Sequence, residues 1–232
     1  MLRGPRGRPV GEPGKPPRHV GIIPDGNRRW AAQHGLPVLE GHRRGAETTM
    51  RALSWCEEAG VEEVTVWALS LDNIARRPNV AGMATAIAEL VDRVDGHPGW
   101  DLRLIGSPGR VALPVRAPDT SKDIVDRRLL VNLAVAYDGR EEIVAAAQAL
   151  LTADPLGKLD ATALSAELER RGQPDCDLII RTSGELRLSG FLLWQSVHSE
   201  LYFAPELWPE FTERSLHRAL DSYARRDRRA GA

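Results

Sequence analysis

Short apolar runs alternate with helical segments along most of this chain. The runs, which carry several β-branched residues, occupy positions 19–24, 63–69, 102–105, 129–136 and 177–180. Between them lie segments with helical spacing or capping signals, at about 41–59, 80–94, 138 onward, 160–171 and 212 onward. Strands that are apolar throughout are typical of a parallel sheet buried on both faces. We therefore predict an α/β fold with a central parallel sheet flanked by helices.

The length of 232 residues suits one α/β domain with a substantial core. Residues 1–17 are rich in Pro, Gly and Arg and lack the apolar segment of a signal peptide, so we predict a disordered leader followed by a single domain over 18–232. No run of 18 apolar residues occurs that would predict a membrane span.

Charge and cysteine usage narrow the class of protein. The formal net charge of -1 gives no general attraction to nucleic acid, and we expect none to bind. Cys56 and Cys176 stand apart from each other and from any histidine cluster. We therefore predict buried free thiols and a cytoplasmic location, with neither a disulfide framework nor a zinc site.

Three polar clusters each follow a predicted strand. They span residues 25–30, 70–77 and 181–189, and each combines small residues, hydrogen-bonding side chains and arginine. The carboxyl ends of parallel strands share one edge of a sheet, where ligands usually bind, so the clusters should meet. Arginines there could hold a phosphorylated ligand, and Asp25 could hold Mg²⁺ together with phosphate oxygens.

Simpler interpretations stay open at this point. Asp25-Gly26-Asn27 is also a common turn sequence, and Arg181 could pair with a surface carboxylate. Neither a Walker A loop nor a GxGxxG motif is present to indicate nucleotide binding. The pattern alone predicts an α/β enzyme that binds a phosphorylated ligand.

Longer motifs resemble a known family. They are HVGIIPDGNRRW at 19–30, Gly41-His42, the segment 70–78, and DLIIRTSGELRLSGFLLWQSVHSELYF at 177–203. Together they resemble the cis-prenyltransferases, also called the undecaprenyl diphosphate synthase family, over about residues 19–231. The LSGF form at 188–191 looks particularly like actinobacterial short-chain members that make Z,E-farnesyl diphosphate.

The resemblance implies condensation of isopentenyl diphosphate with an allylic diphosphate to a short-chain product with a Z double bond. It also implies dependence on Mg²⁺ and a homodimer, and an apolar product would add peripheral association with membranes. The helix at 80–94, with Met83, Ile87 and Leu90 on one face, is a candidate wall for the growing chain.

Residue roles carried over from the family are expectations of the same kind. Asp25 and Asn73 would be catalytic, with Asn73 involved in proton removal, and Asp25 and Glu200 would hold the metal. The substrate-binding residues would be Gly26, Asn27, Arg28, Arg29, Trp30, His42, Ser70, Asp72, Arg76, Arg181, Arg187 and Ser189, with Arg229 and Gly231 of a C-terminal RxG motif that reaches the neighbouring subunit's site in some members.

The sequence also departs from the family pattern. Where Ser-Thr-Glu-Asn-Trp is usual, the chain has Ser70-Leu71-Asp72-Asn73-Ile74, and Val38 stands at a position that is often basic. These changes leave two alternatives: an irregular synthase that makes branched or cyclised products, and a non-catalytic partner subunit. Because non-catalytic subunits typically lose the aspartate of the first motif, the presence of Asp25 favours an enzyme.

Overall fold

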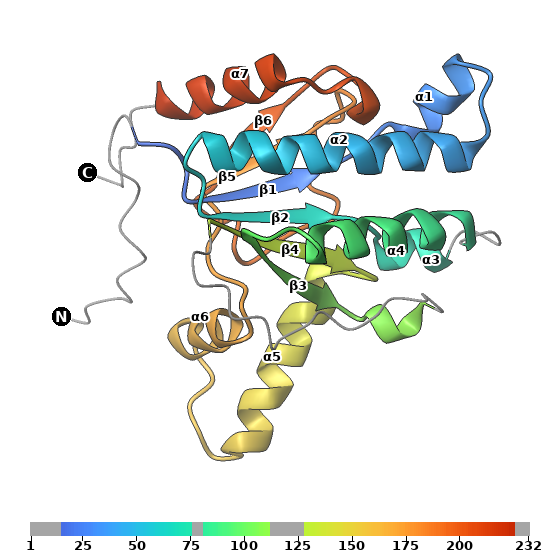
Figure 1. The fold of residues 1–232 in the computed structure, drawn as a ribbon. Helices are drawn as coiled ribbons and strands as arrows, with labels where there is room; N and C mark the ends of the chain where they lie inside the picture. The colour runs from blue at the N-terminus through green and yellow to red at the C-terminus, as the bar shows by residue number, and fades with distance from the viewer. Residues whose placement is uncertain (1–14, 76–80, 112–127, 226–232) are drawn as a thin grey trace.

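The structure is a computed structural model, and it describes residues 15–75, 81–111 and 128–225. Six strands form one sheet in the order β3-β4-β2-β1-β5-β6, and every neighbouring pair is parallel (Figure 1). The strands are β1 His19–Ile23, β2 Glu63–Trp67, β3 Trp100–Gly106, β4 Leu129–Val135, β5 Leu178–Arg181 and β6 Glu200–Phe203.

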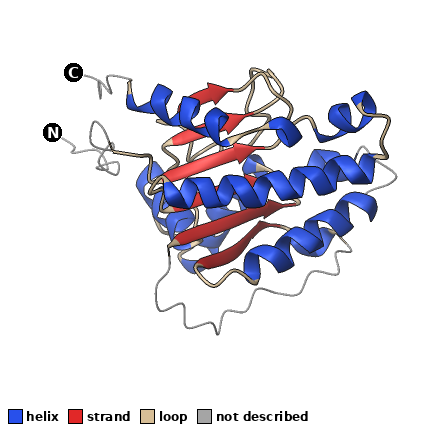
Figure 2. Cartoon of the chain, turned by 45° about the horizontal axis from the view of Figure 1, so that its top comes forward, coloured by secondary structure: helices blue, strands red, loops and turns tan. Residues whose placement is uncertain are grey.

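Helices cover both faces of this sheet. They are α1 Asn27–Gln33, α2 Val38–Glu58, α3 Leu71–Ala75, α4 Ala81–Asp95, α5 Gly139–Ala153, α6 Ala161–Arg170 and α7 Glu213–Ala224. Helices α2, α4 and α7 lie on one face, and α5 and α6 lie on the other (Figures 1 and 2). The predicted α/β fold with a covered parallel sheet is confirmed. No helix within the described ranges is long and apolar enough to cross a membrane.

Capping side chains fix the starts of two predicted helices. The Asp138 carboxylate accepts hydrogen bonds from the backbone N–H groups of Arg140 and Glu141 at the start of α5, and Thr212 accepts one from Ser215 at the start of α7.

The sequence analysis did not predict α1, α3 or β6 as separate elements. Of the predicted leader, only residues 15–17 are described, and Pro17 is already buried, so packed structure begins before residue 18.

The core divides into one large part and two smaller ones, one of which packs α5 against α6. The larger part joins the sheet to α2, α4 and α7 through buried residues such as Leu53, Val91, Leu133 and Leu216. On the opposite face, aromatic side chains of Tyr137 and Phe191 pack with Trp67 and Cys176. Both cysteines are buried free thiols, as predicted.

The strand order places a switch point, which we call the crevice, at the carboxyl edge of the sheet between β1 and β5. The chain leaves β1 for β2 on one side and later returns to place β5 on the other side of β1. At such a switch point, the connections after the two strands run in opposite directions and leave room for a ligand. The loops after Ile23 and Arg181, which are register partners, open into this crevice.

Two glycines allow α1 to lie very close to α2. A Cβ atom at Gly41 would sit 2.3 Å from the backbone oxygen of Asn27 and 2.9 Å from the Cβ of Ala31. At Gly45, a Cβ would sit 2.4 Å from the side-chain Oδ1 of Asn27. These contacts set the position of α1 relative to the rest of the fold.

We predict that Gly41→Ala destabilises the protein although alanine favours helices. The added methyl group would meet a backbone carbonyl, and relief requires moving α1, so we expect a loss of about 1–3 kcal/mol. Helix propensity alone would give a gain of about 0.5–1 kcal/mol. Denaturant unfolding measures the difference. Gly45→Ala should lose less, because the Asn27 side chain can rotate away; a Gly41→Ala variant as stable as the wild type would refute the contact.

Candidate active site

Asp25 is held at the centre of the crevice by its backbone. Its carbonyl oxygen accepts hydrogen bonds from Thr182 Oγ1 at 2.7 Å and from the backbone N–H of Trp208 at 3.0 Å. Gly26, which follows, has a φ of 114°, and a Cβ there would lie 2.9 Å from a Leu207 side-chain carbon. A glycine is therefore required for both the backbone conformation and the space.

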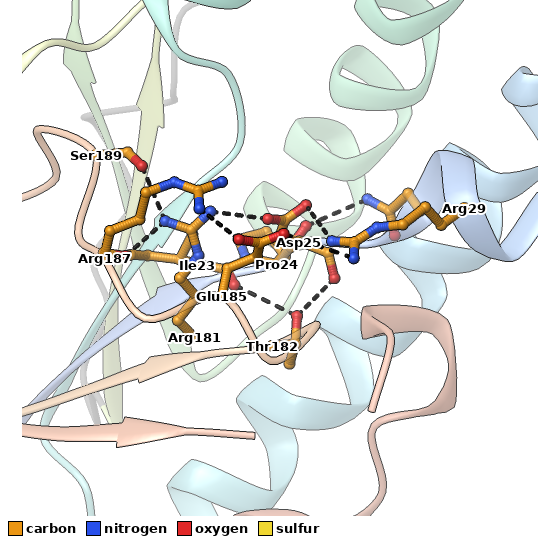
Figure 3. Close-up of polar contacts among 10 residues, drawn as sticks. Ile23, Pro24, Asp25, Arg29, Arg181, Thr182, Glu185, Arg187 and Ser189 are labelled. Atoms are coloured by element: carbon orange, nitrogen blue, oxygen red, sulfur yellow. Dashed lines mark hydrogen bonds and ion pairs between the residues drawn. The ribbon is translucent and has the colours of Figure 1, made fainter. Parts of the chain in front are cut away.

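An ion pair joins this loop to the end of β5. Arg181 Nη2 donates to Asp25 Oδ2 at 2.8 Å, and Nη1 donates to the Arg187 carbonyl oxygen at 2.6 Å and to Ser189 Oγ at 3.0 Å (Figure 3). The Arg181 side chain is only 5% exposed, whereas that of Asp25 is 33% exposed. The arginine is thus a fixed part of the wall, and the carboxylate still reaches solvent.

The pKa of Asp25 lies below its ordinary value. Burial of the carboxyl group alone would raise this pKa, but the hydrogen bond and positive charge of Arg181, with the charge of Arg29, more than offset burial. Asp25 therefore stays ionised well into the acidic range. A partly exposed carboxylate that is ionised at neutral pH is the form that binds a hard cation.

A second set of ion pairs extends from Asp25 across the crevice. Arg29 Nη2 lies 3.5 Å from Asp25 Oδ1, and its Nη1 lies 3.8 Å from Glu185 Oε1. Glu185 Oε2 also accepts a close hydrogen bond from Arg187 Nη1. Figure 3 shows the resulting row of alternating charges, which connects α1 to the loop after β5.

The loop after β5 contains strained residues. Ser183 has a φ of 76° and Ser189 a φ of 54°, values that side chains other than glycine rarely adopt. Ser183 is also buried, and Ser189 accepts the hydrogen bond from Arg181. Such strain costs on the order of 1–3 kcal/mol at each residue and is typical of functional loops.

A small apolar cavity opens beside the first loop. Its volume is about 40 Å³, and it lies between α2 and α4. Asn27 and His42 line it together with Met83, Ile87 and Leu90 of α4, the three side chains that the sequence marked as a candidate wall. Asn27 Oδ1 is buried and has no hydrogen-bond partner among the residues that the structure describes.

The second polar cluster forms the start of α3. Ser70 Oγ accepts a hydrogen bond from the backbone N–H of Asn73 at 3.1 Å, so Ser70 caps this short helix. Asp72 is exposed, and Asn73 is half-buried. Because β2 lies beside β1 in the sheet, the cluster shares the carboxyl edge with Asp25.

A larger cavity of about 530 Å³ lies elsewhere, beyond the ends of β3 and β4 beside α5. Neither Asp25 nor the arginines that surround it contribute to its lining. Its wall includes Glu142, whose carboxylate accepts hydrogen bonds from Tyr137 Oη and Gln195 Nε2. Burial raises the pKa of Glu142, with these hydrogen bonds opposing the shift. We place the site at Asp25, where the charged groups of two loops converge.

The structure does not bring every predicted site residue to this place. Glu200 begins β6 in register with Leu178, which pairs with Val20 on β1. At about 3.3 Å per residue, Glu200 lies roughly 16 Å back along the strands from the level of Asp25. Within one chain, this register does not bring Glu200 to Asp25, because the two lie toward opposite ends of the sheet.

The remaining predicted residues have mixed positions. Arg28 is exposed on α1, and Trp30 stacks on His34 with ring centroids 4.2 Å apart. Arg76, Arg229 and Gly231 lie outside the described residues. The sequence analysis missed the roles of Thr182, Glu185 and Gly45, although the first two stand inside the cluster 181–189.

Comparisons with known proteins identify the family. The family described as "Putative undecaprenyl diphosphate synthase" matches residues 23–231. A (2Z,6E)-farnesyl diphosphate synthase of Thermobifida fusca is 46% identical over 229 residues, covering 93% of this chain and 90% of that protein. A short-chain Z-isoprenyl diphosphate synthase of Mycobacterium bovis is 41% identical, covering 93% of this chain and 88% of its own length.

A solved structure supports the same grouping. Lavandulyl diphosphate synthase from Lavandula x intermedia, in complex with dimethylallyl diphosphate, superposes with a TM-score of 0.76 at 32% identity. The match covers 91% of this chain and 96% of the other. With the family match over residues 23–231 and relatives above 40% identity, these likenesses show that the chain is a prenyltransferase of the undecaprenyl diphosphate synthase family.

Proposed function

We propose that this enzyme condenses isopentenyl diphosphate with an allylic diphosphate and makes a short-chain product with a Z double bond. The observation that carries the proposal is the meeting of two arginine-bearing loops around Asp25 at the switch point of the sheet. Two diphosphates need two such sets of donors. The named products of the relatives from Thermobifida fusca and Mycobacterium bovis support a short chain.

Each loop would take one substrate. Arg28 and Arg29 on α1, with the backbone at Gly26, would hold the allylic diphosphate, while Arg187 and Ser189 would hold isopentenyl diphosphate. Arg181 lies between the two and already donates to groups of both loops. Guanidinium groups suit this task because their planar donors match phosphate oxygens and stay charged.

Mg²⁺ would bind at Asp25. No group of three or more His, Cys, Asp or Glu side chains that could cage a metal ion occurs in the part of the chain that the structure describes. This fits Mg²⁺, which commonly uses one or two carboxylates and completes its shell with substrate phosphates and water. When bound, the ion would stabilise charge on the departing diphosphate.

The protein's own groups would supply the rest of the reaction. Arg181, fixed by three acceptors, is preorganised to stabilise the negative charge that develops as the allylic carbon–oxygen bond breaks. The double bond of isopentenyl diphosphate then attacks the allylic carbon, and loss of a proton creates the new double bond. Asn73, at the same sheet edge, is the residue that we assign to assist this proton loss.

The cavity beside His42 would receive the allylic chain. Its apolar lining from Met83, Ile87 and Leu90 excludes water from the reactive carbon. A volume of about 40 Å³ holds little more than a water molecule, so the walls must separate when a prenyl chain enters.

A homodimer belongs to the same proposal. Strand β6 is an edge of the sheet in the single chain, and Leu201 on it and Val197 before it are exposed. An exposed apolar edge strand favours association with another chain. A cytoplasmic location, with peripheral membrane association through the product, completes the proposal.

Irregular coupling is the second candidate. The solved relative named lavandulyl diphosphate synthase shares the fold at 32% identity and was crystallised with dimethylallyl diphosphate. In the segment that carries Asn73, Leu71 and Ile74 stand where the family pattern has threonine and tryptophan. This chain too could therefore couple its substrates in another geometry.

A substrate assay separates these candidates. We expect the purified protein to form prenyl products from dimethylallyl, geranyl or farnesyl diphosphate only when isopentenyl diphosphate is present, because that substrate provides the attacking double bond. Mass analysis of the dephosphorylated products gives the chain length. Products formed without isopentenyl diphosphate would support irregular coupling, and activity that needs a second protein would support the partner-subunit alternative.

We predict that Asp25→Asn lowers prenyl transfer at least roughly 100-fold. The amide keeps an oxygen acceptor for Arg181 but loses the charge that the metal needs. Product formation from labelled isopentenyl diphosphate measures the effect. Asp221→Asn, an exposed change of the same kind on α7, serves as the control and should keep wild-type activity. Near-normal turnover by Asp25→Asn would contradict the assignment.

The lowered pKa of Asp25 predicts a pH dependence of stability. A carboxylate whose pKa is depressed by folding stabilises the protein above its ordinary pKa, and this contribution is lost as the pH falls through the folded-state value. Wild type should exceed Asp25→Asn by on the order of 1–2 kcal/mol at pH 7, since the pair is only partly buried. Denaturant unfolding should show this difference beginning to shrink at about pH 4 and disappearing only once the pH is below the depressed pKa of Asp25. A difference that did not shrink at all as the pH fell from about 5 toward 1 would exclude the ion pair as its cause.

A further inference from the structure

Glu185 lies between an arginine of each loop. Its Oε1 faces Arg29 Nη1 at 3.8 Å, and its Oε2 accepts the close hydrogen bond from Arg187 Nη1 (Figure 3). The two carboxylate oxygens thus contact arginines from two separate segments. One arginine is on α1, which follows β1, and the other is in the loop after β5. The Glu185 side chain is 34% exposed, so solvent and ligands can reach it.

The charges around the crevice explain the effect of the two ion pairs that Glu185 makes with arginines. Three arginines, Arg29, Arg181 and Arg187, face two carboxylates, Asp25 and Glu185. Arg181 is committed to neighbouring oxygens and is almost fully buried. The half-exposed Arg29 and Arg187 are therefore the groups that can turn to a ligand, and both are paired with Glu185.

We propose that Glu185 is a positioning residue that occupies Arg29 and Arg187 in the free enzyme and is displaced when a diphosphate binds. The inference rests on the proposed function, because it takes these arginines as diphosphate ligands. A carboxylate is an internal competitor for the donors that phosphate oxygens use. While it is paired, it also holds two long, mobile side chains near the places where they are needed, which reduces the entropy cost of ordering them on binding.

Competition and simple structural support predict opposite results. If Glu185 only supported the loop, its removal would weaken diphosphate binding. If Glu185 competes for the arginines, removing its charge should strengthen diphosphate binding. Some positioning of Arg29 and Arg187 would be lost, but a neutral amide would keep part of it. Glu185→Gln keeps the size and the hydrogen-bonding oxygen and removes the charge. Glu185→Asp keeps the charge but is too short to contact both arginines.

The test is calorimetric titration of inorganic diphosphate into the full chain, with a chelator present so that metal does not contribute. Exposed ion pairs are worth about 0.2–1 kcal/mol each, so release of two pairs should lower the dissociation constant roughly two- to thirtyfold in Glu185→Gln. Glu185→Asp should fall between this variant and the wild type. Glu47→Gln, which removes a more exposed carboxylate paired with Arg44 on α2, should bind as the wild type does.

Each outcome decides between the alternatives. If either Glu185 variant that retains the wild-type melting temperature binds diphosphate no tighter than the wild type, the inference is overturned, and so it is if the wild type binds no diphosphate. Prenyl transfer by the wild type is measured separately. An active wild type with unchanged binding in the variants rejects only the role of Glu185. An inactive wild type with tighter binding in the variants rejects the proposed function and keeps the competition.

Discussion

The ion pair between Arg181 and Asp25 connects the two halves of the site. Arg181 ends β5 and Asp25 follows β1, so the pair crosses the point where the sheet changes direction. A buried guanidinium would be costly without acceptors, and here Asp25, Ser189 and the Arg187 carbonyl oxygen supply them. The loop after β5 must fold around the arginine to do so. The left-handed backbone conformations of Ser183 and Ser189 are consistent with a loop that folds tightly around Arg181.

Most of the fold follows from residue patterns. The apolar runs that form β1, β4 and β5 have no exposed position, so burial of these strands on both faces could be predicted from the sequence. Strand β6 was missed because Glu200–Phe203 is short and partly exposed, as edge strands often are. Helix α1 was missed because its sequence, NRRWAAQ, has a single buried residue and no helical apolar repeat.

The site was predictable only in part. Because ligands bind at the carboxyl edge of a parallel sheet, the sequence alone predicted that Asp25 and Arg181 lie close together. The rule gives no strand register, and register is what separates Glu200 from Asp25. Glu185 was visible in the cluster 181–189, but its link to Arg29 depends on how two distant loops face each other. Spacing along the chain contains no such information.

The glycine contacts between α1 and α2 also determine which part of the enzyme can move. With Asn27 seated against Gly41 and Gly45, the first loop and α2 form one rigid body on that side of the cavity. Helix α4 on the other side is tied to α2 by the half-exposed Arg43–Glu89 ion pair, at 3.2 Å, among its polar contacts. Such a pair is weak, and the buried apolar packing that also holds α4 against α2 is non-directional, so α4 can shift where α1 cannot. Entry of a prenyl chain should therefore displace α4 and leave the diphosphate-binding wall still, so that chain length can vary without disturbing the geometry of the reaction.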